Sequence, residues 1–301
     1  MPLVSMTQLM SDALAGGYGL GYFEAWDAYS LEAVCDAAER EKSPVILGFG
    51  GMMANPEWLD RGGVETLGAL GRSRAACLTQ PTALLFNEAQ TREQVDRAMD
   101  SGFTAVMLDT STWPSAQAIP VVAEIVRAAH PRGIAVEAEL GCLPNATEGG
   151  IDVEGSALTQ PEDAAAFVQA TGVDCLAVSI GNVHLLTAHA APVDLDRLGR
   201  IHEATPVPLV IHGGTSFPTK LVAEAVKRGT GKFNVGTTLK RAFWTAVRDE
   251  VRRLEEPLDV HRLMGSHFAE DLLEAGKQAM TLRVQELMRA YGSSGRGRVS
   301  E

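Results

Sequence analysis

Short apolar runs alternate with helix-compatible stretches along this 301-residue chain, and this alternation constrains the fold more than any other feature. Repeated strand and helix signals predict parallel strands joined by helical crossovers. Eight such units most simply close into a TIM (β/α)8 barrel, and an open doubly wound sheet is the structural alternative. The eight predicted strands are residues 18–23, 44–49, 82–86, 105–108, 134–138, 175–180, 208–211 and 232–235.

The composition does not shift along the chain, and no stretch between the predicted strands has the character of a linker. We therefore expect a single domain over residues 1–301, with the barrel at about 17–240. After the barrel, a helical extension is expected at about 239–291, broken at Pro257. The last residues, 292–301, are polar and are expected to form a loose tail.

The charge and the cysteines narrow the class of protein. A formal net charge of −12 and a pI near 5.1 argue against a nucleic-acid partner and against an acidic membrane surface. The 4 cysteines have no spacing typical of a zinc site or of a disulfide framework, which fits a reducing cytoplasm. Neither a signal peptide nor a run of about 18 apolar residues is present in the sequence, so we expect a cytoplasmic protein without membrane spans.

Polar residues gather where the predicted strands end. In a barrel those ends converge on one mouth, where the chemistry of such folds is carried out. The stretch 208–216 shows the pattern best, because an apolar strand runs directly into His212 and two glycines. Glycines let the backbone N–H groups approach an anion, although an ordinary turn beside an incidental histidine would look the same. The residues at the strand ends are Glu24, Asn87, Glu88, Asp109, Glu139, His184, His212 and Asn234.

Over nearly its whole length the chain resembles the class II ketose-bisphosphate aldolases, which include fructose- and tagatose-bisphosphate aldolases. The motifs that carry the resemblance are residues 16–23, 43–47, 98–109, 136–141, 171–181, 207–214, 232–235 and 291–295. In that family a divalent metal, usually zinc, polarises the carbonyl of the ketose. The resemblance therefore implies a TIM barrel, a metal ion and a small-molecule substrate, and by precedent a homodimer or homotetramer.

The resemblance also implies roles for individual residues. His184 and His212 match two histidine ligands of the metal, and Glu139 matches a carboxylate near it. The residues implied at the substrate and its phosphate are Gly181, Gly213, Gly214, Thr215, Asn234 and Thr237.

Several positions depart from the pattern of that family. Asn87 stands where the catalytic aspartate is usual, and an amide cannot carry a proton between substrate oxygens. Glu88 replaces a histidine ligand. Gly50 replaces a serine that contacts a substrate oxygen, Gly236 replaces an aspartate, and Glu24 replaces an asparagine.

The loop that should carry a catalytic glutamate differs as well. Aligned without a gap, Thr147 takes the place of that glutamate, and Glu148 follows one residue later. Glu148 lies in a stretch rich in Gly, Asn and Pro, which could close over a substrate. We predict that Glu148 is the acid/base of the site, with Asn87 and Glu139 as further catalytic residues.

Two hypotheses of function follow. The first is a divergent metal-dependent aldolase-type lyase, which cleaves or forms a C–C bond next to the carbonyl of a phosphorylated or acidic keto substrate. Its metal would be held by Glu88, His184 and His212, with Glu139 as a fourth ligand or a proton carrier. Zinc is implied by the resemblance, and Mn²⁺, Fe²⁺ or Co²⁺ would also suit these ligands. The second hypothesis is a non-catalytic aldolase-like barrel that serves as an accessory or ligand-binding subunit.

Overall fold

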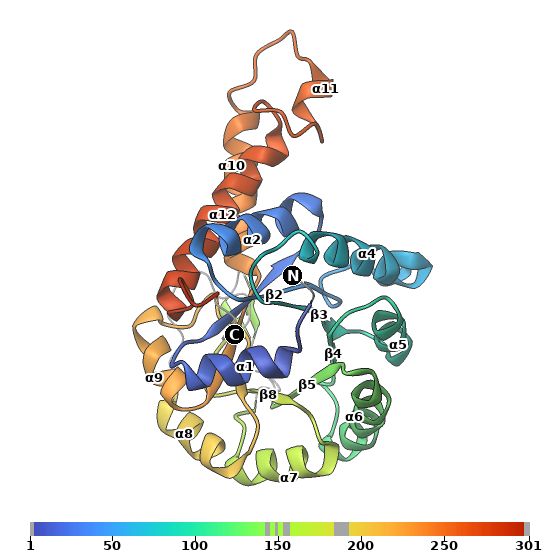
Figure 1. The fold of residues 1–301 in the computed structure, drawn as a ribbon, viewed down its shortest axis with the longest axis vertical. Helices are drawn as coiled ribbons and strands as arrows, with labels where there is room; N and C mark the ends of the chain where they lie inside the picture. The colour runs from blue at the N-terminus through green and yellow to red at the C-terminus, as the bar shows by residue number, and fades with distance from the viewer. Residues whose placement is uncertain (1–2, 142–144, 148–149, 153–156, 184–192, 298–301) are drawn as a thin grey trace.

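A closed barrel of parallel strands forms the centre of the molecule (Figure 1). The computed structural model describes residues 3–141, 145–147, 150–152, 157–183 and 193–297. Around the barrel the strands follow the order β1-β10-β9-β8-β5-β4-β3-β2, which confirms the predicted TIM barrel. The strands are β1 (Leu20–Ala25), β2 (Val45–Gly50), β3 (Thr82–Ala89), β4 (Ala105–Leu108), β5 (Ala135–Leu140), β8 (Cys175–Val178), β9 (Leu209–Ile211) and β10 (Thr230–Val235).

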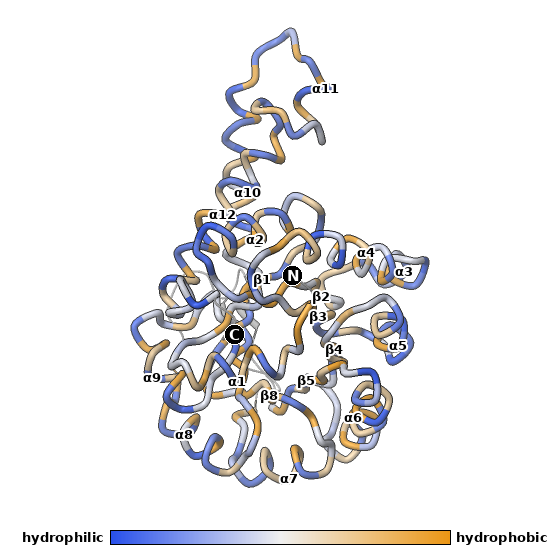
Figure 2. Tube along the Cα trace, in the orientation of Figure 1, coloured by the Kyte–Doolittle hydropathy of each residue, from blue (hydrophilic) through white to orange (hydrophobic). Residues whose placement is uncertain are grey.

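Helices surround the barrel and pack their apolar faces on the strands, which Figure 2 shows as mostly hydrophobic around β3 to β5. The longer ones are α2 (Ala28–Glu41), α4 (Val64–Ala75), α5 (Arg92–Asp100), α6 (Ser115–Ala129), α7 (Pro161–Thr171), α8 (Leu195–Ala204) and α9 (Val222–Lys227). Short helical turns accompany them: α3 (Pro56–Trp58), η1 (Leu59–Gly63), η2 (His130–Arg132) and η3 (Thr219–Leu221).

One small element was not predicted. Strands β6 (Asn145–Thr147) and β7 (Gly150–Asp152) pair antiparallel, in a stretch that the sequence indicated as loop only. Each strand has three residues, which is too short for an alternating hydrophobic pattern to become visible.

Helix α1 (Met6–Ala15) lies across one end of the barrel (Figure 1). Its apolar side chains, such as Met6 and Met10, pack with Leu20, Ile46 and Leu85 from the strands. The barrel interior is therefore filled with apolar side chains at this end, and its polar side chains lie towards the carboxyl ends of the strands.

The C-terminal extension confirms the predicted helices. Helices α10 (Thr237–Val251) and α12 (Leu272–Tyr291) project beyond the barrel as an arm, with α11 (Val260–Leu263) near its tip (Figure 1). The arm exposes apolar side chains, among them Val260, Met264 and Phe268. Within the described part of the chain, none of the helices has the length and apolar character needed to cross a membrane.

Candidate active site at the carboxyl end of the barrel

Polar side chains enter the barrel interior near the carboxyl ends of the strands. Side chains two residues apart point to the same face of a strand, so three strands each contribute an inward pair. These pairs are Tyr22 and Glu24 on β1, Glu137 and Glu139 on β5, and Lys232 and Asn234 on β10.

His212 stands at the centre of this region, one residue beyond the end of β9, and it is 1% exposed. Its backbone is fixed locally, because the side-chain amide of Asn182 donates a hydrogen bond to the His212 carbonyl at 2.8 Å. The next residue, Gly213, has φ of 66°, a conformation that glycine adopts without strain. The chain therefore turns sharply and leaves the imidazole inside the mouth.

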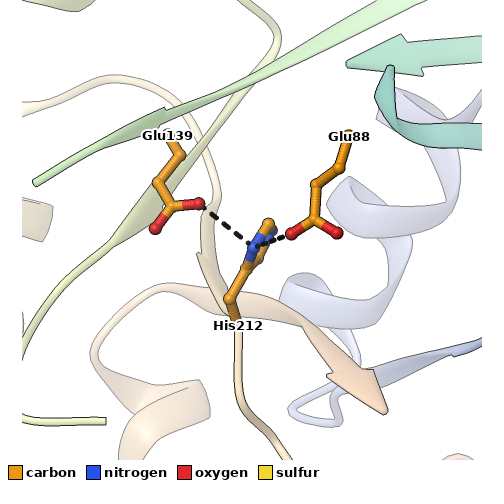
Figure 3. A group of neighbouring side chains, drawn as sticks. All are labelled: Glu88, Glu139 and His212. Atoms are coloured by element: carbon orange, nitrogen blue, oxygen red, sulfur yellow. Dashed lines mark ion pairs between the residues drawn. The ribbon is translucent and has the colours of Figure 1, made fainter. Parts of the chain in front are cut away.

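Two carboxylates face the same ring nitrogen of His212. Nδ1 lies 3.2 Å from Glu88 Oε1 and 3.3 Å from Glu139 Oε2. Figure 3 shows Glu88 and Glu139 approaching the imidazole from opposite sides. Two carboxylates on one nitrogen, one buried and one half-buried, need a cation between them, which can be a proton on the imidazole or a metal ion.

Glu88 reaches the mouth through an irregularity in β3. Phe86 pairs with Val106 on β4 and Ala89 pairs with Leu108, so three steps on β3 oppose two on β4. Such a bulge redirects a side chain, and Glu88 has the left-handed φ of 50°. A non-glycine residue in this conformation costs energy, and such residues concentrate at functional sites.

A buried ion pair lies beneath the histidine. Glu137 Oε1 is 3.0 Å from His212 Nε2, and Glu137 Oε2 is 2.7 Å from Lys232 Nζ. The side chains of Glu137 and Lys232 are both 0% exposed. Neither residue was predicted to belong to the site, although each stands two positions before a predicted site residue, on the same face of its strand.

The buried charges shift each other's ionisation. Burial alone would raise the pKa of Glu137, but the ammonium of Lys232 and the hydrogen bond to His212 hold it at about 2. Burial alone would lower the pKa of His212, but Glu139, Glu137 and Glu88 outweigh this effect and raise it well above its ordinary value. Without a metal, the imidazole is therefore held in its charged form.

The described residues fit a divalent metal ion. Glu88, Glu139 and His212 each offer a ligand atom, and these atoms lie within 4.8 Å of one another. Glu139 also has a second buried oxygen, Oε1, with no hydrogen-bond partner among the described residues. Because Glu137 holds Nε2, the other nitrogen faces the carboxylates, as in many metal sites where a carboxylate orients a histidine ligand. His184, the fourth predicted ligand, lies outside the described residues, as does Glu148.

A cavity of about 350 Å³ opens over this cluster. Of the described residues predicted to bind the substrate, Gly181 and Gly214 do not line it. Gly214 instead allows close packing, since its N–H donates to the Asn234 carbonyl at 2.8 Å and a Cβ there would lie 2.7 Å from that oxygen. The predicted site residues that do line the cavity are Asn87, Glu88, His212, Gly213, Thr215, Asn234 and Thr237.

Two amides in this cavity present unpaired polar atoms. Asn87 is 2% exposed, and its Oδ1 has no hydrogen-bond partner among the described residues. Lys232 Nζ donates to Asn234 Oδ1 at 2.7 Å, and the Nδ2 of Asn234 has no partner in the described part of the chain. Buried polar atoms without partners are costly, so both amides are suited to hydrogen bonding with a ligand.

Comparison with known proteins agrees with this geometry. The family model described as fructose-bisphosphate aldolase class-II matches residues 4–296. A fructose-bisphosphate aldolase of Geobacillus stearothermophilus is 34% identical over 98% of this chain and 99% of its own. A fructose-bisphosphate aldolase of Staphylococcus epidermidis is 30% identical over 99% of this chain and 100% of its own.

The fold is also similar to that of a solved aldolase structure. The YdjI aldolase of Escherichia coli K12 superimposes with a TM-score of 0.80 and 29% sequence identity, covering 99% of this chain and 100% of that one. The match covers the whole barrel, and a histidine and two carboxylates lie together at its mouth. The chain belongs to the class II fructose-bisphosphate aldolases, a family of carbon–carbon lyases.

Proposed function

We propose that this protein is a metal-dependent aldolase-type lyase with an atypical active site, which cleaves or forms a C–C bond next to the carbonyl of a phosphorylated keto substrate. The observation that carries the proposal is the position of His212 Nδ1 between Glu88 and Glu139, inside a cavity whose rim provides donors for an anion. Zinc is the metal that the family most often uses, and it suits this mixed nitrogen and oxygen ligand set.

A divalent ion held by Glu88, Glu139 and His212 would act as a Lewis acid on the substrate carbonyl. Glu137 and Lys232 keep His212 oriented. In cleavage, the electron pair of the breaking C–C bond stays on the carbon beside the carbonyl, and the departing half loses its hydroxyl proton to become an aldehyde. A base must take that proton, and an acid must return one to the carbon. We assign this proton transfer to Glu148.

The anion end of the substrate is proposed to lie at the start of α10. Thr215 and Thr237 line the cavity there, and Thr237 is the first residue of the helix. Backbone N–H groups at a helix N-terminus attract negative charge. Because the N–H of Gly214 already donates to Asn234, an anion would use the neighbouring N–H groups and the two hydroxyls.

One observation favours the second candidate, a non-catalytic barrel. Asn87 replaces the acid at the end of β3, which removes a proton carrier from the mouth. The two candidates differ in a simple test, since only an enzyme should exchange the protons of dihydroxyacetone phosphate with solvent. We expect cleavage of fructose 1,6-bisphosphate itself to be weak or absent.

Metal loading tests the proposed centre directly. Protein incubated with Zn²⁺, Mn²⁺, Fe²⁺ or Co²⁺ and then desalted should retain about one ion per chain. Mn²⁺, Fe²⁺ and Co²⁺ should compete better here than at a three-histidine site, because Glu88 supplies a harder oxygen ligand. Elemental analysis of wild type, His212→Ala and Glu88→Gln measures this, with the exposed His261→Ala as control. Full metal retention in His212→Ala would rule out the site.

Phosphate binding tests the other end of the cavity. Dihydroxyacetone phosphate should bind to metal-loaded protein, and Thr237→Val should raise its Kd about tenfold, since a hydrogen bond to a charged group is lost. Isothermal titration calorimetry measures both constants. Thr245→Val removes a hydroxyl from the same helix away from this cavity and should leave the Kd unchanged. An unchanged Kd in Thr237→Val would place the phosphate elsewhere.

A further inference from the structure

The wall of the cavity formed by β1 and its neighbours contains a carboxylate, Glu24, that is flanked by two glycines. β1 lies between β10 and β2, and Glu24 stands between Gly236 and Gly50. A Cβ at Gly236 would lie 2.7 Å from Glu24 Oε2, and a Cβ at Gly50 would lie 3.2 Å from Glu24 Cδ. The carboxylate thus occupies space that side chains on both neighbouring strands would need.

Glu24, Gly50 and Gly236 all depart from the family pattern, and they lie side by side in the structure. Where that pattern has asparagine, aspartate and serine, this chain has one glutamate and two glycines. The substitutions are therefore linked sterically, since a side chain at either glycine would crowd the position that the Glu24 carboxylate occupies.

The carboxylate of Glu24 is paired with a lysine. Lys240 Nζ, from the first turn of α10, lies 2.6 Å from Glu24 Oε1. The same ammonium lies 5.4 Å from the centre of the Trp26 ring. The pair has no net charge, and an anion could recruit Lys240 only by leaving the carboxylate of Glu24 unpaired beside it.

Another cation, Arg241, lies on the side of Thr215. Arg241 lines the cavity and has no ion pair among the described residues. It also lines a neighbouring cavity together with Thr215 and Thr238. The excess positive charge is therefore on the side of the proposed anion site, so the cavity is built for an anion at that end and for neutral groups at the wall of Glu24.

An apolar pocket continues the cavity past the ion pair. It has a volume of about 310 Å³ and shares Glu24, Met53 and Lys240 with the main cavity. The rest of its lining is largely apolar and aromatic, including Trp26, Phe49, Ala54 and Trp58. A pocket of this kind favours an uncharged group that prefers to leave water.

We propose that the substrate carries a single anionic group, bound near Thr215 and Thr237, and that its far half is uncharged and extends past Glu24 and Lys240 into the apolar pocket. The inference rests on the proposed function and specifies its substrate as a keto monophosphate with an apolar substituent. A second phosphate, with a charge of about −1.5 to −2, would gain no net attraction from the Glu24–Lys240 pair, and it could bind Lys240 only by leaving the Glu24 carboxylate unpaired beside it.

Binding measurements test whether the cavity prefers a ligand with a single phosphate, and they do not require turnover. Metal-loaded wild type should bind D-fructose 1-phosphate at least about tenfold more tightly than fructose 1,6-bisphosphate, by calorimetry. Glu24→Asn frees Lys240 to pair with an anion, so it should tighten bisphosphate binding about tenfold and change monophosphate binding less than about threefold. Glu162→Asn, an exposed change of the same charge on α7, should leave the ratio unchanged.

The apolar pocket is tested with simple phosphate esters. Hexyl phosphate should bind at least about tenfold more tightly than methyl phosphate, because each buried CH₂ group contributes favourably. Ala54→Trp fills the pocket and should abolish that difference while methyl phosphate still binds.

Three results would overturn the inference: equal or tighter bisphosphate binding by wild type, no effect of ester length, or no binding of any probe. Proton exchange of dihydroxyacetone phosphate is measured separately. If proton exchange occurs but one of these three binding results is found, the inference about the substrate is refuted and the proposed function stands. If no proton exchange occurs, the proposed function is refuted.

Discussion

Replacing Lys232 by methionine is expected to lower the free energy of unfolding by about 3–5 kcal/mol, because the substitution leaves a buried carboxylate without its cation. Lys232 and Glu137 are both completely buried, and their charged atoms lie 2.7 Å apart. Lys232 also donates to Asn234 and lies 5.1 Å from the centre of the Tyr22 ring, so its loss removes several contacts at once. Methionine has a similar length, which keeps the cavity term small.

Urea denaturation of the metal-free protein measures this effect, and a second variant separates charge from packing. Lys232→Met combined with Glu137→Gln removes the uncompensated charge and retains a hydrogen-bonding group for His212. The double variant should therefore be more stable than Lys232→Met alone. A loss below about 1 kcal/mol in the single variant would show that Glu137 finds another partner or takes up a proton at little cost.

The pH dependence gives a further reading of the same ion pair. The pKa of Glu137 is about 2 in the folded protein, below the ordinary value of 4.5 for a glutamate. A carboxyl with a lowered folded pKa contributes stability that is present above its unfolded pKa and is lost as the pH falls through the folded one. Between about pH 4.5 and pH 2, wild type should therefore lose this contribution. The difference between wild type and Lys232→Met should narrow across the same window.

Much of the fold was readable because each strand carries its own signal. The run Ala105–Leu108 is entirely apolar and was predicted with the bounds that the structure shows. The position of the site at the mouth of the barrel could also be predicted. The carboxyl ends of all parallel strands in a barrel meet at one face, whichever strands are neighbours. Asn87, Glu88 and His212 stand at such strand ends, and they line one cavity in the structure.

The buried ion pair could not be predicted in the same way. The period of a strand indicates that Glu137 faces the same side as Glu139, but not which residue it meets. Its partner Lys232 stands on β10, which does not pair with β5 in the barrel. A contact across the interior depends on the tilt and stagger of the strands, which the sequence of either strand does not contain.

The contact of Glu24 with Gly50 and Gly236 could not be predicted from the sequence for a related reason. In the sequence, Glu24, Gly50 and Gly236 are three separate departures from the family pattern, far apart in the chain. Only the order β10-β1-β2 around the barrel makes them neighbours. The bulge at Glu88 was likewise invisible, because it depends on how β3 pairs with β4.

Replacing Glu148 by glutamine is expected to reduce turnover at least about a hundredfold, since general acid–base catalysis typically contributes ~10²–10⁴-fold. Asn87 cannot transfer a proton, and Glu139 faces His212 Nδ1 in the group proposed to hold the metal. Glu148 lies outside the described residues, and its assignment rests on its place in a Gly-, Asn- and Pro-rich stretch that could close over a bound substrate.

Exchange of the carbon-bound protons of dihydroxyacetone phosphate with D₂O, followed by NMR, measures this step without an aldehyde. Glu148→Gln should slow the exchange while calorimetry still detects binding of dihydroxyacetone phosphate, because the amide keeps the size of the side chain and loses only the ionisable group. Glu93→Gln, an exposed change on α5, serves as the matched control. Unimpaired exchange in Glu148→Gln would remove the proposed acid/base and transfer the role to Glu24. That carboxyl lines the same cavity as Asn87, and burial raises its pKa despite the nearby Lys240.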